Sequence, residues 1–227
     1  MSDKPVLHHL EYSQSFRSLW LLEELGMDYE LELYERDKKT LLAPAEYKKL
    51  SPLGTAPVIT HGDLALAETS AITDYILDLH GPTPLRPIKG DKHHARHLFW
   101  YHAAQGSLMP LMLVDSVLKI VQKRAPLPVR PMVKLVGKIL VDNFIKPRIS
   151  VLLQKAEADL NKAVWFGGDQ LTVADITMSY PMQSAFERGY IGAEHKHSRA
   201  WLQRIADRPA FKTAQEKDGR PSMVLPL

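Results

Sequence analysis

The chain has 227 residues, of which 45% are apolar and 24% are charged, and 29 Lys and Arg against 26 Asp and Glu give a formal net charge of +3. This composition is typical of a soluble globular protein with one large domain or two smaller ones, and the charge is too close to neutral to indicate nucleic acid as a partner. The absence of cysteine excludes a disulfide framework, a thiolate zinc site, an iron–sulfur cluster and a cysteine nucleophile.

Strand and helix patterns alternate in the first part of the chain. The spacing of apolar residues predicts strands at 6–10, 29–34, 57–60 and 64–67, and helices at 15–25, 44–50 and 70–79. Gly26 and Gly81 stand where helices commonly end, and Gly62 indicates a hairpin turn between the last two strands. The order β-α-β-α-β-β-α predicts a small α/β domain.

Three prolines then interrupt the chain within six residues, at Pro82, Pro84 and Pro87. Such a cluster is typical of a linker between domains. After it the strand patterns disappear, and the sequence predicts helices at 91–123, 132–160, 172–188, 198–206 and 209–217. A bend is expected in the first of these, near Gly106 and Pro110, and an interruption of the second near Pro147. We therefore predict an α/β domain at 1–81, a linker at 82–90 and an all-helical domain at 91–227.

No targeting or membrane segment is expected. The N-terminus runs into the first strand pattern without a basic and apolar leader. The most apolar stretch, 108–118, is broken by Pro110 and Asp115, and it is shorter than the ~20 residues that span a bilayer. Together with the missing disulfides, these features favour a cytoplasmic protein with no membrane partner.

Thr172 and Asp175 form a capping-box pattern before an apolar helix. The Thr172 hydroxyl can accept from the Asp175 N–H, and the Asp175 carboxylate can accept from the Thr172 N–H, with Leu171 and Ile176 as the hydrophobic staple. This pattern indicates a role in folding and not in chemistry.

Pro57 opens a predicted strand in the middle of the α/β part, where a proline fits poorly. A cis bond after Ala56, in a tight turn, would leave the Ala56 backbone free to pair with a ligand. The alternative is a trans proline at a strand edge, which is the more common arrangement.

Glu68 and Thr69 stand at a predicted junction from strand to helix. The N–H groups and the dipole of a helix N-terminus favour a ligand carboxylate, and Glu68 beside them could take an ammonium group, so the end of an α-amino acid would satisfy both. The alternative is a plain helix cap by Thr69. Ser13 and Ser15 precede another helix, where one of them is an N-cap or presents its hydroxyl to a ligand held by the other motifs.

The order and spacing of these motifs are more specific than any one of them. In chain order they are Ser13-x-x-x-Arg17, Pro57, Glu68-Thr69 and Thr172-x-x-Asp175. The series covers essentially the whole chain and resembles the cytosolic glutathione transferase family. The stretches 19–26, 51–57, 106–110 and 185–188 resemble a serine-type branch of that family found in fungi and bacteria.

The resemblance implies a thioredoxin-like N-terminal domain that binds glutathione, followed by a helical-bundle domain that lines the electrophile site. By similarity, the residues that bind glutathione are Ser13, Ser15, Thr55, Ala56, Pro57, Glu68 and Thr69. Relatives usually carry Ser where Thr69 stands, and often a longer polar side chain where Thr55 stands. Ser13 is the expected catalytic residue, because a hydroxyl that donates to sulfur favours the thiolate; lowering a thiol pKa of about 8.5 by two units takes about 2.7 kcal/mol.

The electrophile site is expected along the helix that begins near Asp91. The candidates for its lining are Tyr101, Gln105, Leu108, Met109 and Met112. Each of them could equally be a core residue. Relatives often carry Glu where Gln105 stands.

Two other patterns have simpler explanations. His93 and His97 lie one helical turn apart, but without a completing ligand set they indicate a solvated helix start, and no metal is expected. The basic stretch 119–138 holds no acid; it could attract anions or nucleic acid, although a charged helix face is the common explanation.

The leading hypothesis is a homodimeric glutathione transferase that conjugates the glutathione thiolate to hydrophobic electrophiles, with peroxidase activity toward organic hydroperoxides as a second reaction. Glutathione acts as the co-substrate in this interpretation. The alternatives are a non-catalytic glutathione- or ligand-binding protein on the same fold, and a glutathione-dependent isomerase or dehalogenase.

Overall fold

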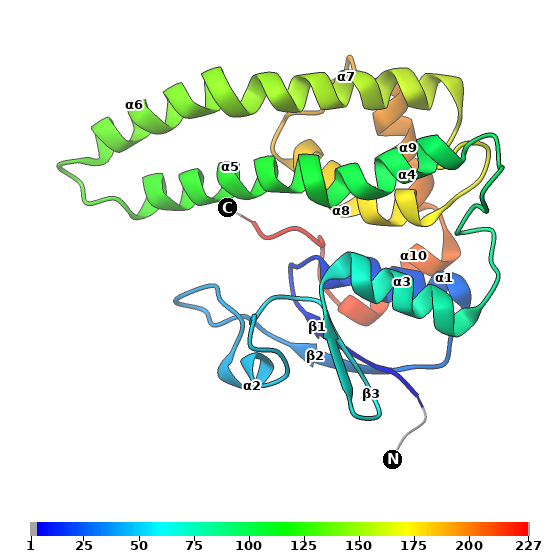
Figure 1. Ribbon diagram of the computed structural model, residues 1–227. Coiled ribbons are helices and arrows are strands. Elements are labelled where there is room, and N and C mark those ends of the chain that lie inside the picture. The colour runs from blue at the N-terminus through cyan, green and yellow to red at the C-terminus, as the bar shows by residue number, and fades with distance from the viewer. Residues whose placement is uncertain (1–3, 227) are drawn as a thin grey trace. The chain divides into compact units, whose positions relative to one another are not determined.

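The computed structural model describes residues 4–226, which form two compact units (Figure 1). One unit holds the chain up to Arg86 together with the segment Arg204–Leu225, and the other consists mainly of Pro87–Gln203. The predicted fold class, an α/β part followed by an all-helical part, is confirmed. The grouping of residues 204–225 with the α/β unit was not expected from the sequence, because a helical pattern does not reveal what the helix packs against.

The α/β unit is built on a four-stranded sheet in the order β2-β1-β3-β4. Its strands are β1 (Val6–Leu10), β2 (Glu30–Tyr34), β3 (Val58–His61) and β4 (Leu64–Ala67). β1 runs parallel to β2 and antiparallel to β3, and β4 is antiparallel to β3. Leu7, Leu10, Val58 and Ile59 are all buried, so both central strands contribute to the core.

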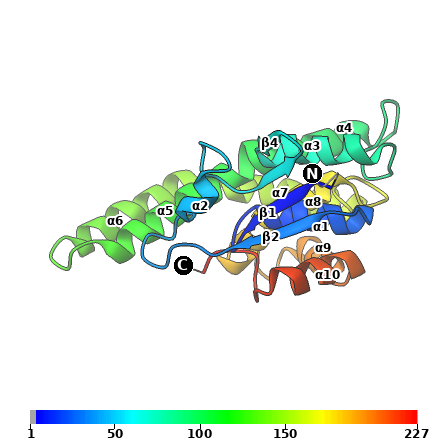
Figure 2. The ribbon, with the colours of Figure 1, turned by 90° about the horizontal axis from the view of Figure 1, so that it is seen from below.

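Four helices belong to this unit. They are α1 (Ser15–Leu25), α2 (Ala45–Lys48), α3 (Thr69–His80) and α10 (Pro209–Asp218). α1 ends as predicted at Gly26, whose φ of 62° lies in the left-handed region that glycine adopts without strain. α10 lies beside α1 (Figure 2), where the Phe211 ring packs edge-on against Phe16 and Trp20. The C-terminal segment is therefore part of this unit's core.

The helical unit contains two long helical stretches that each pass through a short π-helix. Their elements are α4 (His94–Ala103), η1 (Ala104–Leu108), α5 (Met109–Arg124), α6 (Arg130–Leu140), η2 (Val141–Ile145) and α7 (Lys146–Lys162). α8 (Val173–Glu187) and α9 (Lys196–Ala206) follow. Each π-helix directly precedes a proline, Pro110 or Pro147, in the first turn of the next helix. Proline removes one i→i−4 hydrogen bond and its ring crowds that carbonyl, so the wider turn occurs where the sequence predicts irregularity.

The predicted capping box is present at the start of α8. The Thr172 hydroxyl also accepts from the Ala174 N–H at 3.2 Å, and the Asp175 carboxylate accepts from the Thr172 N–H at 3.1 Å. Asp175 is fully buried and also accepts from the Phe166 N–H at 2.7 Å and the Trp201 indole N–H at 2.9 Å. Burial raises the pKa of Asp175, and these donors act in the opposite direction. One side chain thus ties α8 to α9 and to the preceding loop.

We expect Asp175→Ala to lower the free energy of unfolding by about 3 kcal/mol or more, because several buried donors lose their acceptor at once. Urea denaturation followed by circular dichroism measures the change. Asp169→Ala is the matched control, since its exposed carboxylate pairs with Lys92 at the surface, and it should leave the midpoint unchanged. Equal stability of the two variants would contradict the structural role of Asp175.

Candidate functional site

The ends of three strands, β1, β3 and β4, lie together at one edge of the sheet. In the strand register, His8 of β1 lies opposite Val58 of β3, and Val58 lies opposite Ala67 of β4. The carboxyl end of β1, the amino end of β3 and the carboxyl end of β4 therefore lie side by side. Each of the three ends leads into a motif singled out from the sequence: Ser13 after β1, Ala56-Pro57 before β3, and Glu68-Thr69 after β4.

The turn after β1 holds Ser13 and Ser15 in a buried hydrogen-bond network. The Ser13 hydroxyl lies 2.6 Å from the Leu10 carbonyl oxygen, to which it can donate, and 2.7 Å from the Ser15 hydroxyl. It also accepts from the Ser15 N–H at 3.2 Å, so it satisfies a donor at the start of α1 as an N-cap would. Ser15 is 0% exposed and Ser13 is 5% exposed. Of the two hydroxyls, Ser13 is the one that lies closer to solvent.

Arg36 fixes the conformation of this turn. Its side chain donates to the carbonyl oxygens of Glu11 at 3.0 Å and Tyr12 at 3.2 Å. Tyr12 has a φ of 49°, which is unusual for a residue with a side chain. Since such a backbone conformation persists only where neighbours hold it, the Arg36 contacts position the residue directly before Ser13.

The bond between Ala56 and Pro57 is cis. Pro57 is buried and Ala56 is partly exposed, whereas Thr55 before them is exposed. Of the two arrangements that the residues alone left open, the structure therefore has the turn and not the trans strand edge. The Ala56 backbone precedes β3 at the sheet edge described above.

Glu68 and Thr69 form the junction between β4 and α3. Glu68 has a φ of 76° and an exposed side chain, and a non-glycine residue in such a conformation costs about 1–3 kcal/mol and is typical of ligand clamps. Thr69 is 2% exposed, and its hydroxyl accepts from the Arg17 guanidinium at 3.2 Å. Arg17 is itself buried in α1. The Ser-x-x-x-Arg motif is thereby joined to the Glu-Thr motif by a direct contact.

The five electrophile-site candidates lie in the helical unit, on α4, η1 and α5. Tyr101, Leu108 and Met112 are buried, whereas Gln105 and Met109 are partly exposed. Burial alone does not separate a core residue from a pocket residue, so their role stays a prediction.

The histidines of the candidate metal pattern have other partners. His93 pairs with Asp169 at 3.1 Å, and His97 hydrogen-bonds the Thr172 hydroxyl at 2.9 Å. Within residues 4–226, no group of three or more His, Asp or Glu side chains is arranged to hold a metal ion.

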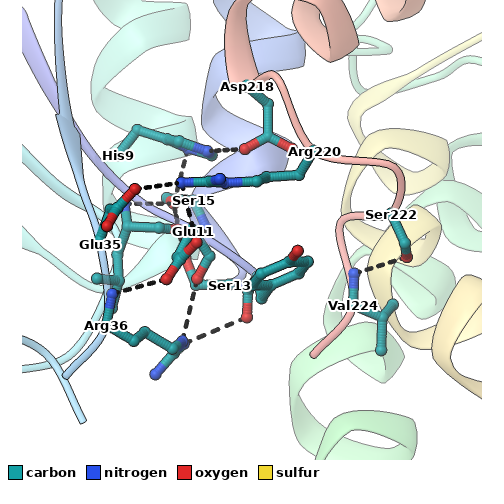
Figure 3. Close-up of polar contacts among 12 residues, drawn as sticks. His9, Glu11, Ser13, Ser15, Glu35, Arg36, Asp218, Arg220, Ser222 and Val224 are labelled. Carbon is teal, nitrogen blue, oxygen red and sulfur yellow. Dashed lines mark hydrogen bonds and ion pairs between the residues drawn. The ribbon is translucent and has the colours of Figure 1, made fainter. Parts of the chain in front are cut away.

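The sequence analysis missed the contribution of the C-terminal segment to this site. Asp218, at the end of α10, accepts from His9 of β1 at 2.7 Å, and Arg220 pairs with Glu11 and Glu35 at 3.0 Å each (Figure 3). About 200 residues separate the partners in the sequence. No local pattern could have revealed these contacts.

Comparisons with known proteins match both parts of the chain to one family. Residues 13–79 match the model of the glutathione S-transferase N-terminal domain, and residues 144–209 match that of the glutathione S-transferase C-terminal domain. Glutathione S-transferase 3 of Schizosaccharomyces pombe is 31% identical over 93% of this chain and 87% of its own length. Glutathione S-transferase 1 of Saccharomyces cerevisiae is 29% identical over 93% of this chain and 94% of its own length.

A solved structure agrees with these matches. A glutathione S-transferase from Actinobacillus pleuropneumoniae superposes with a TM-score of 0.76 at 29% identity, covering 95% of this chain and 93% of that one. A thioredoxin-like unit combined with a helical unit defines the class of two-domain transferases. The chain belongs to the glutathione S-transferase family, and glutathione is its co-substrate.

Thr69→Val should destabilise the α/β unit by about 1–3 kcal/mol, because it keeps the shape of the side chain but leaves a buried guanidinium N–H of Arg17 without its acceptor. Thr69→Ser keeps the hydroxyl and should remain close to the parent. Urea denaturation of the three proteins compares them. If the Thr69→Val and Thr69→Ser proteins had the same free energy of unfolding, the contact between Thr69 and Arg17 would contribute nothing to stability.

Proposed function

We propose that the chain adds the glutathione thiolate to hydrophobic electrophiles, with the α/β unit binding glutathione and Ser13 activating its sulfur. The observation that carries this proposal is the meeting of three motifs at one sheet edge. Adjacent strands lie about 4.8 Å apart, so the ends of β1 and β4, on either side of β3, are about 10 Å apart. An extended tripeptide spans about the same distance.

From the strand order, we assign each part of the tripeptide to one motif. The cysteinyl part pairs with the Ala56 backbone before the central β3, next to Thr55 and Pro57. The γ-glutamyl end lies toward β4, where the N-terminus of α3 attracts its carboxylate and Glu68 its ammonium group. Thr69, held by Arg17, keeps the junction in place.

The sulfur then lies toward β1 and Ser13. A donated hydrogen bond from a hydroxyl favours thiolate over thiol, and the N-terminus of α1 adds a favourable dipole. Ser15 is fully buried, and its hydroxyl lies within hydrogen-bond distance of the Ser13 hydroxyl. No base in the protein is required, since the proton can leave to solvent.

The electrophile is held by the helical unit, within residues 91–227. Gln105 and Met109 are the partly exposed members of the candidate set, whereas Tyr101, Leu108 and Met112 are buried. Their mostly apolar character supports a hydrophobic electrophile, and an organic hydroperoxide with an apolar body fits the same surface. The non-catalytic, isomerase and dehalogenase alternatives differ from this proposal in turnover and product, which an activity panel distinguishes.

Ser13→Ala tests the mechanism. We expect kcat with an aryl halide at neutral pH to fall about 25-fold, because a rise of the thiol pKa from about 6.5 to about 8.5 lowers the thiolate fraction at pH 7 from about three quarters to about 3%, with glutathione affinity little changed. Steady-state kinetics measure the first quantity and titration calorimetry the second. Equal rates would remove Ser13 from the mechanism, and parent protein that shows no glutathione binding would remove the proposal itself.

We also propose a cytoplasmic location. By length and composition, the stretch His94–Arg124 could cross a membrane. However, it contains Asp115, which is buried in the helical unit and paired with Lys119 at 3.1 Å and Arg188 at 3.6 Å. These ion pairs support a helix that folds within a soluble domain and not one surrounded by lipid.

A homodimer accounts for the apolar side chains that α5 and α6 expose. They are Leu113, Val114, Val117 and Val121 on α5, and Leu135, Val136 and Ile139 on α6, each 45–59% exposed. Exposed apolar surface on neighbouring helices is typical of an interface. A second copy of the chain is the proposed partner.

We expect sedimentation velocity to give the mass of a dimer for the parent and of a monomer for the double variant Val117→Lys/Leu135→Lys. Two buried charges in an apolar interface cost far more than two at a surface. Leu33→Lys, at a side chain of β2 that is 57% exposed, is the control and should stay dimeric. A monomeric parent would contradict this assembly.

A further inference from the structure

A continuous row of hydrogen bonds runs from the C-terminal segment to Ser13 (Figure 3). The Asp218 carboxylate lies 2.7 Å from His9 Nε2, and His9 Nδ1 lies 2.9 Å from the Ser15 hydroxyl. The Ser15 hydroxyl in turn lies 2.7 Å from the Ser13 hydroxyl. All distances are within the range of good hydrogen bonds. The row therefore links four side chains from β1, the following turn, α1 and α10.

Every member of this row is buried. Asp218 and His9 side chains are each 2% exposed, Ser15 is 0% exposed and Ser13 is 5% exposed. A buried carboxylate is costly unless it is paired, and here the His9 imidazole lies within hydrogen-bond distance of it through Nε2. The neighbouring charges of Arg220, Glu11 and Glu35 pair with each other.

The protons of the row follow from the partners. Asp218 can only accept, so His9 donates to it through Nε2. The Leu10 carbonyl oxygen can only accept, so its 2.6 Å contact uses the single Ser13 proton. The 2.7 Å contact between the two hydroxyls is then made by the Ser15 proton, with the Ser15 oxygen 2.9 Å from His9 Nδ1. The Ser13 oxygen accepts, and its own proton remains to be donated. The Leu10 carbonyl takes this proton at 2.6 Å, but a thiolate is the stronger acceptor because it is charged.

We infer that His9 and Asp218 are positioning residues of the transfer reaction, which direct the Ser15 hydroxyl onto Ser13 and so present the Ser13 proton to the glutathione sulfur. This inference rests on the proposed role of Ser13. Hydrogen bonds that point the same way polarise one another, so each donor in the row strengthens the next. The pair of Asp218 and His9 stands at the start of the row, and the developing thiolate stands at its end.

The packing of α10 explains why a residue near the end of the chain serves this site. Phe211 anchors α10 against α1 through Phe16 and Trp20, and Arg208 pairs with Glu24 of α1. The Phe211 contacts bring the last turn of α10, with Asp218, to His9, whereas the Arg208 pair adds to the stability of the helix. Asp218, and not the C-terminal segment as a whole, therefore acts on the site.

Asp218→Asn tests the inference, because it keeps the size of the side chain and removes its charge. The first readout is the apparent pKa of bound glutathione, followed as the ultraviolet absorbance of the thiolate against pH. We expect it to rise by about one unit, with kcat at neutral pH about threefold lower and KM for glutathione unchanged. At high pH, where the thiol ionises without assistance, the rates of variant and parent should converge.

Ser15→Ala interrupts the row at its middle and should give the same rise, which keeps the test valid if one variant folds poorly. Arg208→Gln is the matched control, since it removes an ion pair that holds the same helix. It should lower thermal stability without moving the pKa of bound glutathione. If Asp218→Asn and Arg208→Gln behaved alike, Asp218 would be structural and the inference would be overturned.

The outcomes separate this inference from the proposed function. If Ser13→Ala loses the thiolate absorbance while Asp218→Asn and Ser15→Ala keep it at the parent pKa, the inferred role of His9 and Asp218 is wrong and the role of Ser13 stands. If the parent protein itself gives no thiolate signal with glutathione at saturation, both fail together.

Discussion

The register between β1, β3 and β4 is the constraint on which the candidate site depends. Leu7 and Leu10 point to opposite faces of the sheet and are both buried, so a slip of one residue would exchange the side chains of β1 between two packed faces and disturb both, and burial fixes the pairing of His8 with Val58. Once that pairing is fixed, three segments are held close together. They are the turn after β1, the cis proline before β3 and the junction after β4. Hydrophobic burial thus assembles a polar site whose own residues contribute little to the core.

Side-chain contacts then hold two of the three segments in conformations that the backbone does not favour. Tyr12 and Glu68 both have positive φ values, and each lies next to a residue with a proposed contact to glutathione. Arg36 secures the first turn through carbonyl oxygens, and Arg17 secures the second through Thr69. Guanidinium groups suit this task, since they offer several donors in a rigid plane to acceptors on different segments.

The sequence predicted the elements well wherever one physical signal dominated. Strand alternation and helix periodicity located the sheet and the long helices, and prolines located the irregular points at η1 and η2. Ser13, Pro57 and Glu68 could be selected because each is a local motif at an element boundary. The pairing of His9 with Asp218 could not, because in the sequence Asp218 is only an acid at the end of a helix, and its partner depends on how α10 packs. The packing of residues 204–225 into the α/β unit could not be predicted for the same reason.

The proposed binding of glutathione and the proposed binding of the electrophile rely on different kinds of interaction. This difference explains why the sequence indicates the glutathione site more clearly than the electrophile site. In the proposed site, glutathione is held by hydrogen bonds and charges, which are directional and require particular residues at particular places. The side chains proposed to hold the electrophile are mostly apolar, and their contribution follows buried area and not direction. A surface of that kind accepts molecules of many shapes at similar free energy. On this proposal, selectivity for the sulfur and tolerance toward its target arise from the same chain, through the contrast between a polar network in one unit and an apolar lining in the other.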